Sequence, residues 1–89
     1  MSSQVLSKAE IFERLKSLLI NKFELGNDQI VPDAQLATEL GLDSIDWIDM
    51  AVALEEETGQ RLLEDDLSSI RTIQDVVDML YGKLNAERN

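Results

Sequence analysis

Apolar residues recur at helical spacing in three separate stretches of this chain, and that spacing favours a helical fold. The first stretch follows Ser7-Lys8-Ala9-Glu10, a capping box in which the serine and glutamate side chains bond backbone N–H groups at a helix start. Its apolar positions are Ile11, Phe12, Leu15, Leu18, Leu19 and Phe23. Because these positions share one helix face, a helix is predicted over about residues 7–22.

The second stretch predicts a helix from about Ser44 to Thr58. Asp43 is its predicted cap, Asp46 completes an acidic variant of the capping box, and Gly59 is the expected stop. At about 100° per residue, this helix has two apolar faces. The core-facing residues are Trp47, Met50, Ala51, Leu54 and Thr58. The residues opposite are Ile45, Ile48 and Val52, bordered by Asp49, Glu55 and Glu56.

The third stretch predicts the last helix. Thr72 is its predicted cap, and Asp75 occupies the third helical position. Its core-facing residues are Ile73, Val76, Val77, Leu80 and Leu84. A short acidic helix is predicted before it, within residues 62–70, with Leu63, Leu67 and Ile70 on one face. Residues 24–42 form a long connection. Its apolar residues, expected to hold it across the open end of the helices, are Ile30, Val31, Leu36, Leu40 and Leu42.

These segments together predict an all-α fold. We expect a small four-helix bundle, with three longer helices, one short helix, and a long loop between the first and second helices. The chain is expected to form a single domain over residues 1–89, with a core at about 5–84 and polar ends.

The composition excludes several classes of function. The formal net charge of −10 argues against nucleic acid as a partner, because nucleic-acid binders need clustered Lys and Arg. The chain has no cysteine and no histidine, so it has no disulfide and no catalytic triad around Ser44. No apolar run resembles a signal peptide or reaches the length of a membrane span. A cytoplasmic monomer is expected.

Acidic residues gather in one part of the chain. Nine of them lie from Asp43 to Asp66, with Arg61 as the one base in that range. Asp43, Asp46 and Asp49 do not have the spacing of a calcium-binding loop, so no metal site is predicted. The second apolar face of the 44–58 helix, bordered by acids, is typical of a protein–protein docking site. The alternative is that this face packs on another helix, but buried carboxylates without partners are costly.

Ser44 stands at the junction of the loop and the second helix, where its hydroxyl is expected to face solvent. The segment Leu40-Gly41-Leu42-Asp43-Ser44-Ile45-Asp46, with Ala53-Leu54-Glu55-Glu56-Glu57 after it, resembles the 4′-phosphopantetheine attachment motif of acyl carrier proteins. The resemblance covers roughly residues 5–84. It implies that Ser44, within an Asp43-Ser44 motif, receives the prosthetic arm of coenzyme A from a phosphopantetheinyl transferase.

The same resemblance implies a function and a set of partners. Such a carrier catalyses nothing itself and presents thioester-linked acyl groups to enzymes of fatty acid, polyketide or specialised lipid pathways. The implied partners are acyl-transferring, ketosynthase or acyl-activating enzymes with basic docking patches. The residues expected to meet them are Ile45, Asp46, Ile48, Asp49, Val52, Glu55 and Glu56.

Trp47 departs from the family pattern, in which this position commonly holds a smaller residue. We expect it to be largely buried near the base of the arm, where it limits the room for an acyl chain. The candidates for an acyl pocket are Trp47, Met50, Ala51 and Leu54. Two other readings stay open, a peptidyl or aminoacyl carrier and a non-carrier acidic helical adaptor.

Overall fold

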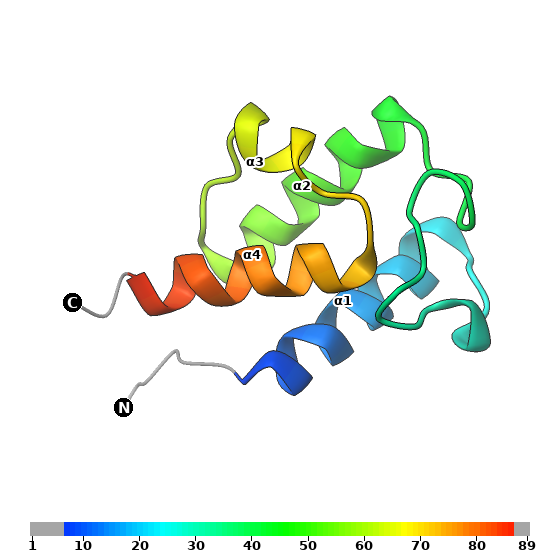
Figure 1. The fold of residues 1–89 in the computed structure, drawn as a ribbon, viewed down its shortest axis with the longest axis horizontal. Coiled ribbons are helices and arrows are strands. Elements are labelled where there is room, and N and C mark those ends of the chain that lie inside the picture. Colours follow the sequence, from blue (N-terminus) through cyan, green and yellow to red (C-terminus); the bar gives the residue numbers. More distant parts are fainter. Residues whose placement is uncertain (1–6, 87–89) are drawn as a thin grey trace.

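The computed structural model describes residues 7–86, and within them the chain is helical. The helices are α1 (Lys8–Phe23), α2 (Ser44–Thr58), α3 (Glu64–Ser68) and α4 (Ile73–Ala86), with a short 3₁₀ helix at Asn27–Gln29. Helix α1 packs against both α4 and α2, and α3 lies above α4 beside α2 (Figure 1). The predicted small four-helix bundle is confirmed. The polar ends at 1–6 and 87–89 lie outside the described residues.

Side-chain caps set the helix starts where the sequence predicts them. At α1, the Glu10 N–H donates to Ser7 Oγ at 3.1 Å, and the Ser7 N–H donates to Glu10 Oε1 at 2.9 Å. At α4, the Asp75 N–H donates to Thr72 Oγ1, and the Thr72 N–H donates to Asp75 Oδ2, both at 3.1 Å. These reciprocal bonds satisfy backbone donors that have no partner within the helix.

One buried cluster joins the inward faces of the longer helices with the loop. The buried helical residues are Ile11, Leu15, Leu19, Met50, Ala51, Leu54, Ile73, Val76, Val77, Leu80 and Leu84. All five predicted positions of the last helix are among them. Their apolar surface, removed from water, is the main stabilising contribution to the fold.

Backbone hydrogen bonds tie the long loop to the start of α4. The Leu36 N–H donates to the Arg71 carbonyl at 2.9 Å, and the Ile73 N–H donates to the Ala34 carbonyl at 3.1 Å. An isolated antiparallel bridge joins Gln35 to Thr72 between them. The loop residues buried in the cluster are Ile30, Ala34, Leu36, Leu40 and Leu42. The prediction was wrong for Val31, whose side chain is 43% exposed.

Helix α3 has five residues and is held from both sides. Asp66 accepts the Leu63 N–H at 2.9 Å and pairs with Lys83 of α4 at 2.9 Å. The Leu63 N–H, followed by the Lys83 ammonium group, lowers the pKa of Asp66 below its usual value. The prediction that Leu63 shares one face with Leu67 and Ile70 was wrong, since Leu63 is 55% exposed whereas Ile70 is buried. Its backbone is extended at the cap position, so it lies outside the helix, while Leu62 is buried.

Candidate functional site

The backbone on either side of Ser44 is fixed by hydrogen bonds. The Asp46 N–H donates to Asp43 Oδ1 at 3.0 Å, and the Asp43 N–H donates to Asp46 Oδ2 at 3.2 Å. Upstream, Gly41 turns the chain with a φ of +71°, a conformation that glycine adopts readily. Leu42 is buried, and its N–H donates to the Leu36 carbonyl at 3.0 Å. The loop therefore delivers Ser44 to the first position of α2.

The Ser44 side chain is exposed and available for modification. Within residues 7–86, its hydroxyl takes part in no hydrogen bond. The chain has no histidine or cysteine that could activate it, so a base must come from another protein. A phosphodiester attached here would lie at a helix N-terminus, where the dipole favours an anion, although Asp43 adds a negative charge beside it. An exposed, unbonded hydroxyl fits the covalent group that the resemblance implies.

An open groove of about 600 Å³ begins at Ser44, and we call it the Ser44 groove. Its walls come from the loop, the start of α2, and α3. The lining residues are Ala37, Leu42, Asp43, Ser44, Trp47, Ile48, Leu67 and Ser68. Most of these side chains are apolar, so the groove can shelter an apolar group from water.

The acyl-pocket candidates do not line one cavity. Trp47 lines the Ser44 groove, and it is partly buried against the core cluster. Met50, Ala51 and Leu54 are buried in the helical core instead. Sequence reasoning missed Leu67, which reaches the groove from α3. No local signal could have found it, because its place depends on how α3 is anchored.

The outward face of α2 carries exposed apolar side chains, as the sequence predicts. Ile45, Ile48 and Val52 are 69%, 59% and 50% exposed. Asp49 and Glu56 beside them are exposed too. The alternative that this face packs against another helix is therefore excluded for the described chain.

Two further docking candidates have partners within the chain. Asp46 is part of the α2 capping box. Glu55 is half-buried, and its Oε2 accepts the Leu62 N–H at 2.8 Å. Glu55 therefore holds the segment that leads into α3.

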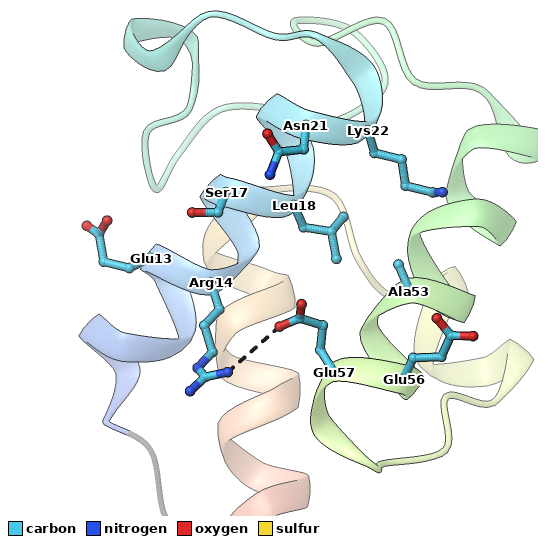
Figure 2. A pocket seen from close by; sticks show the side chains of 9 residues that line it. All are labelled: Glu13, Arg14, Ser17, Leu18, Asn21, Lys22, Ala53, Glu56 and Glu57. Carbon is cyan, nitrogen blue, oxygen red and sulfur yellow. Dashed lines mark ion pairs between the residues drawn. The ribbon is translucent and has the colours of Figure 1, made fainter.

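A second open groove, of about 740 Å³, separates α1 from α2. Figure 2 shows Arg14 and Lys22 extending from α1 towards α2. Arg14 pairs with Glu57 at 3.8 Å. The basic side chains of α1 thus offset part of the acidic charge of α2 on this side, while Asp49 and Glu56 make no ion pair among the described residues.

The described residues show neither a metal site nor a membrane-spanning helix. No group of three or more acidic side chains within residues 7–86 is arranged to hold a metal ion. In the same range, no helix has the length and apolar character needed to cross a membrane.

Comparison with known proteins points to one family. Residues 13–80 match a family model described as a phosphopantetheine attachment site. The chain is 37% identical to acyl carrier protein 2 of Ralstonia nicotianae, over 91% of this chain and all of that protein. It is 31% identical to the acyl carrier protein of Thermosynechococcus vestitus, with the same coverage. It is 29% identical to that of Petrotoga mobilis, over 92% of this chain and 96% of that protein.

Proposed function

The chain belongs to the acyl carrier protein family, and on that premise we propose that it carries acyl intermediates as thioesters on an arm attached to Ser44. The covalent cofactor of this family is 4′-phosphopantetheine. The observation that carries the choice of residue is the exposed, unbonded hydroxyl at the first position of α2. The names of the relatives favour acyl cargo over peptidyl or aminoacyl cargo.

In this proposal the chain's own residues supply position and recognition. Ser44 provides the oxygen that becomes bonded to phosphorus, and the serine proton passes to a base of the phosphopantetheinyl transferase. The pyrophosphate bond of coenzyme A breaks in the same step, and adenosine 3′,5′-bisphosphate is the leaving group. Asp43 and Asp46 hold the start of α2, so the backbone that carries the hydroxyl is fixed. The chain has no cysteine, so the thiol that bears the acyl group belongs to the cofactor. The chain itself catalyses no step.

The attachment residue can be tested by intact-mass analysis. Wild-type protein incubated with a phosphopantetheinyl transferase and coenzyme A should gain the mass of one phosphopantetheine group. Ser44→Ala should keep its helical circular dichroism spectrum and gain no mass. Ser68→Ala is the matched control, because Ser68 is another exposed serine on the Ser44 groove, and it should be modified like the wild type. Full modification of Ser44→Ala would end the proposal.

We further propose that the outward face of α2 receives the partner enzymes. This docking face consists of Ile45, Ile48, Asp49, Val52 and Glu56. Its exposed apolar side chains can be desolvated by a partner, and its unpaired acids suit a basic patch around that contact. The partner classes that fit are the transferase and acyl-transferring, ketosynthase or acyl-activating enzymes with such patches. Fatty acid, polyketide and specialised lipid pathways all use enzymes of these classes.

A further inference from the structure

The open groove of about 740 Å³ between α1 and α2, which we call the α1–α2 groove, borders the docking face. Glu56 belongs to both, since it is an exposed acid of the docking face and also lines this groove. Leu18 and Ala53 contribute apolar surface between the two helices (Figure 2). A partner enzyme that sits on the docking face therefore lies beside this groove as well.

The wall that α1 contributes to this groove carries hydrogen-bond donors without partners. Ser17, Asn21 and Lys22 line the groove and are exposed. Within residues 7–86, Lys22 forms no ion pair, and the side chains of Ser17 and Asn21 make no hydrogen bond. Ser17 and Asn21 are four positions apart, so they lie on the same side of the helix. Such a wall can bind a carboxylate, which accepts hydrogen bonds from hydroxyl, amide and ammonium groups.

The charges at the other end of the groove are compensated within the chain. Arg14 pairs with Glu57 at 3.8 Å, and Glu13 points away from α2 (Figure 2). Among the described residues, Lys22 is thus the one cation of the groove without a partner acid. It lies in the last turn of α1, where the helix dipole favours a cation. The dipole alone does not require a side chain that extends towards α2, as that of Lys22 does (Figure 2).

A partner surface that carries only basic side chains does not suit this border of the docking face. A base that pairs with Glu56 would share the groove with the Lys22 ammonium group, and like charges brought together across an interface reduce affinity. We propose that the α1–α2 groove receives an acidic side chain of the phosphopantetheinyl transferase, which pairs with Lys22 while bases of the transferase meet the docking face. This inference rests on the proposed function and adds a contact of opposite sign to partner recognition.

Reversing the charge of Lys22 separates this contact from general attraction between the two proteins. Lys22→Glu makes the chain more negative, so general attraction to a basic enzyme surface would speed modification of Ser44. The proposed contact predicts the opposite. In low salt, kcat/KM with the cognate transferase should fall about five-fold, because one exposed ion pair is lost and a like charge takes its place. Lys22→Arg keeps the charge and should stay close to the wild type, and Lys22→Gln should lie between.

Lys16→Glu is the matched control, because it makes the same change of charge on the same helix outside the groove. Lys16 does not line the α1–α2 groove, and its ammonium group lies 5.8 Å from the centre of the Phe12 ring. Its kcat/KM should equal or exceed that of the wild type. Intact-mass analysis follows modification of every variant, at a temperature at which circular dichroism shows each of them to be folded.

The outcomes separate this inference from the function on which it rests. Absence of any mass gain in the wild type would overturn the proposed function and this inference with it. Normal modification of the wild type, with Lys22→Glu modified at least as fast, would overturn the groove assignment alone. Equal slowing by Lys16→Glu would do the same.

Sedimentation equilibrium of the chain alone tests whether a second copy supplies the acidic side chain instead. The wild type and Lys22→Glu should both sediment as monomers in low salt. Self-association of the wild type that Lys22→Glu abolishes would assign the groove to a second copy and overturn the proposal.

Discussion

Gly59 ends α2 in a left-handed conformation, with a φ of +73° and its N–H bonded to the Glu55 carbonyl. A residue with a Cβ is strained there, so Gly59→Ala should lower the free energy of unfolding by about 1–2 kcal/mol. Gly82 is the matched control, because it lies within α4 and a Cβ there would meet no atom within 4 Å. Gly82→Ala should raise the free energy of unfolding by about 0.5–1 kcal/mol. Urea unfolding curves compare the two, and a change in the same direction for both would refute this account.

Trp47 shows the limit of sequence reasoning at a single residue. The helical wheel gives the direction of its side chain, inward beside Leu54, but not its depth. Trp47 lies in the first turn of α2, where it lines a groove with residues of the loop and α3 and also packs against the buried cluster. Those contacts depend on segments distant in sequence, so the wheel gives the direction of the ring but does not reveal the groove that it lines.

Met50 and Trp47 of α2 differ in burial, so substitutions at the two positions should differ in their effect on the free energy of unfolding. Met50 is fully buried, so Met50→Ala should cost about 2–5 kcal/mol through lost contacts and a cavity. Trp47→Leu should cost less, because only part of the indole is buried and leucine keeps much of that contact. Thermal and urea unfolding of both variants give the comparison. A loss for Trp47→Leu as large as that for Met50→Ala would mean that the ring is a core residue after all.

At the scale of elements, the sequence predicts helices better than the contacts between them. Ser7, Asp43 and Thr72 are capping residues whose partners lie three positions away, so local spacing reveals them. The anchors of α3 are different. Glu55 reaches the N–H of Leu62, and Lys83 reaches Asp66 from another helix. Such pairs form only in the packed fold, so no local spacing in the sequence predicts them.

Because Asp66 anchors α3, we expect the free energy of unfolding to depend on pH. The pKa of Asp66 is lowered in the folded state, first by the Leu63 N–H and then by Lys83. Its contribution to stability is therefore fully present above its unfolded pKa of about 3.8 and is lost as pH falls through the folded value. The difference in unfolding free energy between wild type and Asp66→Asn should be constant from about pH 7 to pH 5 and shrink below about pH 4.

The neighbouring acid controls for a general effect of removing charge. Asp65 is exposed and pairs with no base among the described residues, so Asp65→Asn should show a much smaller difference at neutral pH. If Asp65→Asn and Asp66→Asn changed the free energy of unfolding equally at every pH, the bonds of Asp66 would not specifically stabilise α3.

At the scale of the whole molecule, the net charge of −10 acts on association rather than on the fold. Asp49→Lys reverses a charge on the docking face, and Asp33→Lys makes the same change at an exposed loop position. Exposed charges add little to folding, so both variants should unfold close to the wild type. Asp49→Lys should slow association with the phosphopantetheinyl transferase several-fold in low salt, and added salt should reduce the difference.

The Asp33→Lys control tests whether the association rate depends on the position of the reversed charge or on the total charge of the protein. Stopped-flow association kinetics at several salt concentrations measure both variants. Asp33→Lys should associate almost as fast as the wild type. Equal slowing by Asp33→Lys and Asp49→Lys would mean that net charge alone guides the partner, and the docking face would then be wrongly assigned.

The hydrogen bonds between the loop and the start of α4 also lead us to expect a particular order of folding events. The Gln74 N–H donates to the Pro32 carbonyl at 2.8 Å, and Leu36 and Ile73 make the bonds beside it. These contacts join segments far apart in the chain, and such contacts form late because they must close a large loop first. We therefore expect the segment that presents Ser44 to take its final shape only after the beginning of α4 is in place. A chain interrupted before residue 74 would contain the attachment serine without the framework that presents it to the transferase.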